Sequence, residues 1–181
     1  MSYCHFCRSL PAEHPDRHYH DHEYGFPALD DRDLLERLAL EINQAGLSWS
    51  TILKKRATLQ SAYANFVPTH VAAFKESDIE RLLLDTGIIR HRGKIQAIID
   101  NAKTILALQK SHGSFKAWLE AHKALSLEQW CSLFKRTFRF TGGEITRSFL
   151  LSTGYLSGAH DADCPVFAQI KALGSSINEE P

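Results

Sequence analysis

The chain has 181 residues, of which 44% are hydrophobic and 23% charged, and its formal net charge is zero. These values fit one globular domain, residues 1–181, that buries its own core. The sequence lacks the run of about 18 apolar residues that a membrane span needs and the long apolar core of a signal peptide. We therefore expect a soluble, cytoplasmic, monomeric protein with no membrane partner.

Charge is distributed unevenly along this neutral chain. Residues 49–148 hold 16 Lys and Arg against 8 Asp and Glu. This middle segment could face the phosphates of a nucleic acid. Folding can also mix the segments in space and cancel the difference, so charge alone does not decide the partner.

The apolar spacing is helical, and no alternating strand pattern of useful length is present. The first predicted helix covers 33–45, where Leu34, Leu38 and Glu41 recur at helical spacing after an aspartate N-cap among residues 30–33. Further helices are predicted at 48–65, 69–75, 77–85, 91–110, 114–122, 126–136 and 143–156. The predicted fold class is all-α, and a polar tail at 174–181 is expected to be frayed.

Cysteines and histidines at the two ends of the chain suggest a metal site. Cys4 and His20 lie near one end, and His160 and Cys164, four residues apart, lie near the other. Two thiolates and two imidazoles form a closed tetrahedral zinc shell, which is structural because no position stays open for water. The alternative is a set of unrelated surface histidines and buried, reduced cysteines. Three other residues could compete as ligands: Cys7, His18 and His22. Cys7 forms a C-x-x-C pair with Cys4.

Residues 78–105 are predicted to form a helix, a tight turn and a second helix, and they resemble a helix-hairpin-helix. Amides around Gly87 and at the start of the second helix could hold a phosphate, with Arg90, Arg92 and Lys94 beside them. Such a motif binds the DNA backbone without reading its sequence. The alternative is an ordinary helical hairpin with basic residues on its solvated face, since the usual second turn glycine is missing.

Glu41 interrupts the apolar stripe of the 33–45 helix, so its carboxylate should be at least partly enclosed. It precedes Gly46, an exposed Leu47 and the ring of Trp49. Such a break could enter a base stack and hold an extruded base. Alternatively, Glu41 pairs with a buried arginine or caps a helix, and Trp49 belongs to the core.

Three sequence blocks resemble 3-methyladenine DNA glycosylase I, the constitutive Tag-type family of the helix-hairpin-helix superfamily. They are YHDHEYGFP at 19–27, LEINQAGLSWSTILKKR at 40–56 and TGIIRHRGKIQAII at 86–99. The resemblance extends over nearly the whole chain and includes the spacing of His160 and Cys164.

The resemblance implies a DNA-repair enzyme that flips 3-methyladenine, and other N3-alkylated purines, out of alkylated double-stranded DNA. It would hydrolyse the N-glycosidic bond without lyase activity. The expected base-pocket residues are Glu41 as the candidate catalytic residue, with Tyr19, Trp49 and Phe6 around the base. The expected ligands of one structural Zn²⁺ per chain are Cys4, His20, His160 and Cys164.

Some positions depart from the family pattern. Asp16 stands where a pocket tyrosine is usual, and Phe6 stands where a tryptophan is common. The segment after Phe115 lacks the family's Trp-Ser-Phe-Val block, and the turn at Gly142 lacks its threonines. The substrate preference of the pocket is therefore expected to differ.

Two other classes of protein remain open at this point. His20 and Asp21 form a literal HD pair, as in metal-dependent phosphohydrolases, but a convincing set of further His and Asp ligands is missing. The other class is a non-catalytic, zinc-containing DNA-binding module in which Glu41 would be structural.

Overall fold

The computed structural model describes residues 2–173, and their regular secondary structure is entirely helical, as predicted. No helix in this part of the chain has both the length and the apolar character needed to cross a membrane. The expected frayed tail at 174–181 lies outside the described residues. The helices are α1 Tyr3–Arg8, α2 Pro15–His22, α3 Asp31–Gln44, α4 Trp49–Ala62, η1 Ala64–Phe66, α5 Pro68–Ala72, α6 Glu76–Leu84, α7 Arg92–His112, α8 Phe115–Ala121, α9 Leu127–Thr137, α10 Gly143–Ser152 and α11 Pro165–Ala172.

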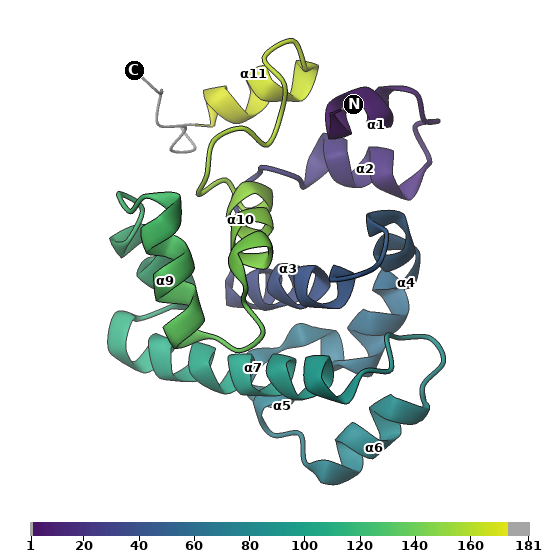
Figure 1. Cartoon of the computed structure of the whole chain (residues 1–181), viewed down its shortest axis with the longest axis vertical. Helices are drawn as coiled ribbons and strands as arrows, with labels where there is room; N and C mark the ends of the chain where they lie inside the picture. The colour runs from purple at the N-terminus through teal and green to yellow at the C-terminus, as the bar shows by residue number, and fades with distance from the viewer. Residues whose placement is uncertain (1, 174–181) are drawn as a thin grey trace.

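Helices α3 and α7 form the centre of the molecule. Five helices pack directly on this pair: α4 and α10 contact α3, while α5, α6 and α8 contact α7. Helix α9 packs on α10. Figure 1 shows α7 crossing below α3, with α10 standing above α3. The fully buried side chains of the central pair include Leu34, Leu38, Ile42, Ile95, Ile98 and Ile105.

An aromatic cluster joins α8, α9 and α10. The rings of Phe115 and Phe149 stack with their centroids 6.0 Å apart, and Phe134 lies 5.5 Å from Phe149. Such rings bury large apolar areas and prefer these offset or tilted arrangements. The cluster therefore holds α10 in place on the core.

Two predicted helices end earlier than expected. The helix predicted at 48–65 ends at Ala62 and is followed by η1, whose Asn65 has a left-handed φ of 54°. The helix predicted at 143–156 ends at Ser152, because Gly154 adopts a φ of +77°. A Cβ atom at Gly154 would lie 2.8 Å from the carbonyl oxygen of Gly25, so this turn needs a glycine.

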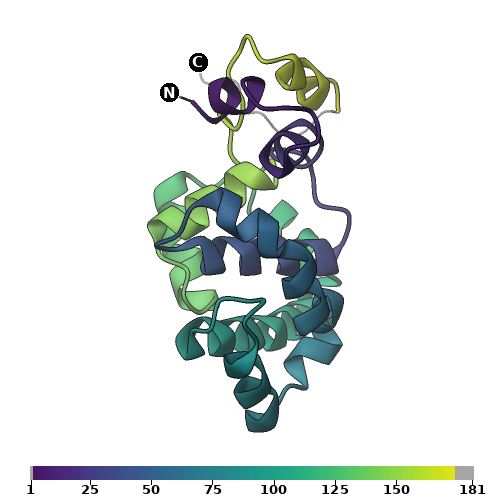
Figure 2. The same cartoon turned by 90° about the vertical axis from the view of Figure 1, so that its right-hand side faces the viewer.

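The helices α1, α2 and α11 were not predicted. They lie together at one end of the molecule, although α11 follows α1 by more than 150 residues (Figures 1 and 2). They are six, eight and eight residues long. A separate small apolar cluster joins α1 to α11 through Cys4, Cys164, Val166 and Ile170. Helix α2 packs on α1.

Arg37 connects this end of the molecule to the core. Its guanidinium donates to the carboxylate of Asp33 and to the backbone carbonyls of Glu23, Phe26 and Ser152, at 2.9–3.2 Å. A buried charge is tolerated where a counter-charge and hydrogen bonds satisfy it. Arg37 thereby fixes the α2–α3 connection against the C-terminal end of α10.

Candidate active site and metal centre

A cavity of about 180 Å³ lies where α2, α3, α4 and α10 meet. Its volume is below the roughly 300–1,000 Å³ of sites for drug-sized ligands, so it suits one small ring system. It brings together three of the predicted pocket residues, Tyr19, Glu41 and Trp49. The complete lining is Tyr3, Tyr19, Tyr24, Glu41, Gln44, Trp49 and Ser148.

The Glu41 carboxylate is the only acidic group in this lining. Its side chain lies on α3 and is 6% exposed, and no described residue donates a hydrogen bond to it or pairs with it. Burial raises the pKa of Glu41 to about 8. The nearest arginine on the same helix, Arg37, is already bonded to Asp33. The cavity thus offers an acceptor that no protein group satisfies.

Aromatic rings form the walls of the cavity. The rings of Tyr19 and Trp49 have centroids 5.1 Å apart and are inclined by 56°, and Tyr24 lies 5.9 Å from Tyr19. The indole nitrogen of Trp49 is buried without a hydrogen-bond partner among the described residues. Faces of this kind can hold a flat or cationic ring.

Phe6 does not line the cavity, in contrast to its predicted role. Its side chain is 38% exposed, and its ring stacks on Tyr3 with centroids 6.3 Å apart. Sequence reasoning also missed four lining residues. Tyr24 and Gln44 lie within the blocks quoted above but had no spacing signal of their own, and Tyr3 and Ser148 lie outside those blocks.

The loop between α3 and α4 presents an apolar residue at the rim. Gly46 has a φ of +83°, and Leu47 beside it is 39% exposed. The Gln44 side chain donates to the carbonyl of Leu47 at 2.8 Å, and Ser48 caps α4. Because Gln44 also lines the cavity, Leu47 is held next to the cavity, as a stack-entering residue would be.

Helices α6 and α7 form the predicted helix, turn and helix, but the amide at Gly87 is not free as predicted. The Gly87 amide donates to the Asp85 side chain at 2.7 Å, and its carbonyl accepts from Thr58 of α4. The Gly87 amide is therefore not available to a phosphate. The amides of Arg92 and Gly93, in the first turn of α7, have no acceptor within residues 2–173.

The three predicted basic residues of the hairpin differ in availability. Arg90 is exposed and has no ion-pair partner among the described residues, and Arg92 makes an exposed pair with Glu76 at 2.7 Å. Exposed pairs of this kind contribute little and exchange readily. Both side chains can therefore reach a phosphate.

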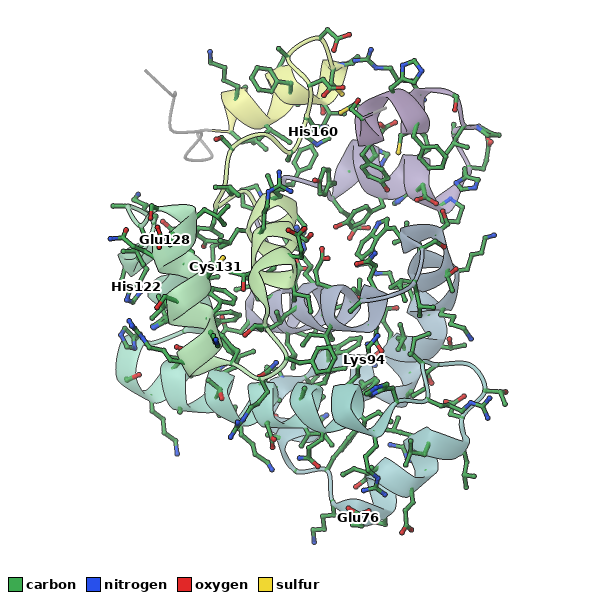
Figure 3. All side chains as sticks on the ribbon, in the orientation of Figure 1. Glu76, Lys94, His122, Glu128, Cys131 and His160 are labelled. Carbon is green, nitrogen blue, oxygen red and sulfur yellow. The ribbon has the colours of Figure 1, made fainter. Side chains whose placement is uncertain are left out.

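Lys94 has a structural role instead of the predicted one. It is 5% exposed, and its ammonium group donates to the carbonyls of Asn43 and Ala45 at 2.9 and 2.7 Å. Figure 3 shows Lys94 between α7 and the end of α3. Burial lowers its pKa. Lys94 caps the C-terminal end of α3 and supports the loop that carries Leu47, so it is not free to contact DNA.

The predicted metal ligands converge at the end of the molecule that holds both termini. The ligand atoms of Cys4, His20, His160 and Cys164 all lie within 4.8 Å of one another, and all four residues are buried. Three sulfur-to-nitrogen separations are 3.6–3.7 Å. Tetrahedral zinc with bonds of about 2.3 Å to sulfur and 2.0–2.1 Å to nitrogen would require about 3.6 Å, so the cluster fits this ion.

Both imidazoles are oriented by their second nitrogen. Nδ1 of His20 lies 2.7 Å from the Asp21 carboxylate, and Nε2 of His160 lies 2.7 Å from the carbonyl oxygen of Tyr24. Such partners fix the tautomer that coordinates a metal. Asp21 is thus an orienting group and not a ligand, and the described residues contain no second cluster of this kind, so the phosphohydrolase interpretation fails.

The competing ligands lie outside the cluster. Cys7 is buried, and its thiol faces the carbonyl of Asp16 at 3.5 Å. The rings of His18 and His22 pack on each other with centroids 4.6 Å apart. The C-x-x-C pair therefore does not act as a chelating unit.

The cavity suits a base taken out of a duplex. It has the size of one ring system, aromatic walls, an unpaired carboxylate and an exposed apolar residue at its rim. Among the described residues, the hairpin offers two first-turn amides and Arg90 without partners, and Arg92 in an exposed ion pair. This combination defines a DNA glycosylase of the helix-hairpin-helix class.

Comparison with known proteins identifies the family. The family model for methyladenine glycosylase matches residues 11–129. DNA-3-methyladenine glycosylase 1 of Escherichia coli (strain K12) is 39% identical over 158 residues, which cover 77% of this chain and 84% of that protein. The Haemophilus influenzae DNA-3-methyladenine glycosylase is 36% identical over 170 residues, covering 81% of this chain and 89% of that one.

A solved structure agrees with the sequence comparisons. That of 3-methyladenine DNA glycosylase I from Staphylococcus aureus superposes with a TM-score of 0.81 at 33% identity, covering 92% of this chain and 96% of that one. The chain belongs to the methyladenine glycosylase family.

Proposed function

We propose that this protein excises 3-methyladenine from alkylated double-stranded DNA by hydrolysing the N-glycosidic bond, and that Glu41 recognises the extruded base. The observation that carries the proposal is the Glu41 carboxylate, buried without a partner in an aromatic cavity of about 180 Å³. Family membership supports the same reaction.

The chemistry of the substrate explains why this lining can be sufficient for base release without a general acid. Alkylation at N3 makes adenine cationic, so the base leaves as a neutral molecule when the bond to C1′ breaks, and it needs no protonation by the enzyme. Water then adds to C1′ and loses a proton. The cavity must recognise a cationic ring, which Tyr19 and Trp49 do through their faces and Glu41 through its charge and acceptor oxygens.

Two surface features would bind the DNA duplex. Leu47 would enter the stack from which the base has left, and the hairpin would bind the backbone through the first-turn amides of α7 with Arg90 and Arg92. The Cys₂His₂ cluster would hold one zinc ion. Because that ion would be fully coordinated by protein, it would stabilise the fold and take no part in hydrolysis.

The reaction is tested directly by base release. Incubation with methylated duplex DNA is expected to liberate free 3-methyladenine, detected by chromatography. The DNA strand should stay uncut, because the residues that line the cavity include no lysine that could act as a lyase group. Retention of DNA without base release would instead indicate a binding module.

Backbone binding by the hairpin is tested by salt dependence. The double variant Arg90→Ala, Arg92→Ala is expected to bind all duplexes more weakly and to reduce the slope of log K against log salt by about 0.9 for each phosphate that the variant no longer neutralises. The matched control is Lys94→Met, which should destabilise the protein and leave the salt slope unchanged, since Lys94 is buried. Unchanged binding of the double variant at low salt would rule out the hairpin as the backbone-binding element.

A further inference from the structure

Tyr3 is a cavity-lining residue that comes from an unexpected place. It is the first residue of α1, directly before Cys4 of the metal cluster, and its ring lines the cavity with Tyr19 and Trp49. It packs edge-on against Tyr24, with centroids 5.4 Å apart and an interplanar angle of 82°.

The hydroxyl group of Tyr3 points to Asp16. It lies 3.3 Å from the Asp16 carbonyl oxygen and 3.4 Å from its Oδ1. Asp16 is 1% exposed, and its Oδ2 accepts no hydrogen bond from a described residue. Nδ1 of His14, which accepts from the Asp16 amide, lies 3.5 Å from this oxygen.

Asp16 lies one turn before Tyr19 on α2, so the two side chains project from the same face of that helix. Because the Asp16 carboxylate faces the hydroxyl group of Tyr3, a larger side chain at position 16 would extend toward Tyr3. The short aspartate leaves room for the ring of Tyr3 and accepts a hydrogen bond from its hydroxyl group.

We propose that Tyr3 is a base-contacting wall of the pocket, replacing the tyrosine that this chain lacks at position 16, and that Asp16 is the positioning residue that holds its ring. This inference rests on the proposed function. It also makes the metal centre part of the recognition site, because Cys4 and Tyr3 are neighbours on a six-residue helix.

The test compares Tyr3→Leu, which keeps apolar volume without a π face, with Tyr3→Phe, which keeps the ring. Affinity for free 3-methyladenine is measured by calorimetry, with base release and zinc content measured on the same samples. Tyr3→Leu is expected to weaken base affinity by about 2- to 13-fold, the range of a contact between two aromatic rings. Tyr3→Phe keeps the ring but loses the hydrogen bond to Asp16, so it should weaken base affinity less than Tyr3→Leu does.

Matched variants separate recognition from packing. His5→Ala, on the same short helix but exposed and outside the cavity, should bind the base normally. Adding Asp16→Tyr to Tyr3→Leu should restore at least part of the affinity, and Asp16→Asn, which still accepts from Tyr3, should retain more affinity than Asp16→Ala.

Normal base affinity of Tyr3→Leu with zinc retained would overturn the proposal. So would an equal loss in His5→Ala or in Tyr3→Phe. Failure of the proposed function is a separate result, because the unmodified protein would then release no 3-methyladenine from methylated DNA.

Discussion

Glu41→Gln is expected to lower kcat/KM for release of 3-methyladenine from DNA by about 10- to 150-fold. A hydrogen bond between a buried acceptor and a charged partner contributes roughly 1.5–3 kcal/mol, and the substitution removes both the charge and one acceptor oxygen. Affinity for undamaged DNA should hardly change, because the carboxylate lies inside the cavity. Single-turnover kinetics on methylated duplex DNA provide the measurement.

Glu36 offers a matched control on the same helix. It is as buried as Glu41, but its carboxylate accepts from Arg56 at 2.6 Å and from Gln60 at 2.8 Å. Glu36→Gln should therefore lower the melting temperature and leave base release by the folded protein intact. If Glu41→Gln behaved in the same way, Glu41 would be a structural residue and its assignment to the pocket would be wrong.

The raised pKa of Glu41 adds a pH dependence to this comparison. The carboxyl has a pKa of about 8 in the folded protein, against 4.5 without burial, so between these values the folded state binds more protons than the unfolded state. Stability must then fall as pH rises from about 4.5 to about 8. Glu41→Gln removes this fall, and the variant should melt higher than the parent protein above pH 8.

Unlike stability, activity should increase as pH rises over the same range. If the ionised carboxylate binds the cationic base, kcat/KM of the parent protein should rise through pH 8, because this parameter reports the free enzyme. Tyr19 and Tyr24 stay neutral there, since burial raises the pKa of Tyr24 to about 12 and that of Tyr19 well above its usual value. A flat profile for the parent protein would contradict the role of Glu41.

The long helices could be predicted from sequence because each buries a stripe with a helical repeat. The N-cap predicted among residues 30–33 is Asp30, which accepts from the amide of Asp33 at 2.8 Å. The short helices α1, α2 and α11 could not be predicted, because a metal cluster and a small apolar core hold them in place and local periodicity does not. Long-range contacts of this kind leave no trace in a sequence window.

A residue of the candidate site could be predicted where its polarity conflicts with its position on a helix. Glu41 was noticeable because it lies on an apolar stripe, and the structure places it in the cavity with Tyr19 and Trp49. Lys94 was misjudged because a basic residue next to arginines gives no indication of its burial, which depends on the carbonyls at the end of α3, about 50 residues earlier. Tyr3 was missed because its role depends on the packing of α1 against α2.

Removal of the metal is expected to have the largest effect on stability. Cys164→Ser should lose bound zinc and lower the melting temperature sharply, because structural zinc contributes roughly 10–16 kcal/mol in small zinc-binding peptides and here would join residues 156 positions apart. Elemental analysis of protein purified without chelator should give one zinc per chain, and Cys7→Ser, a buried cysteine outside the cluster, should retain it. Base affinity should fall together with zinc content, since Tyr3 and Tyr19 are neighbours in sequence of Cys4 and His20. Protein that contains no metal and melts at the same temperature as Cys164→Ser would show that the cluster binds no zinc.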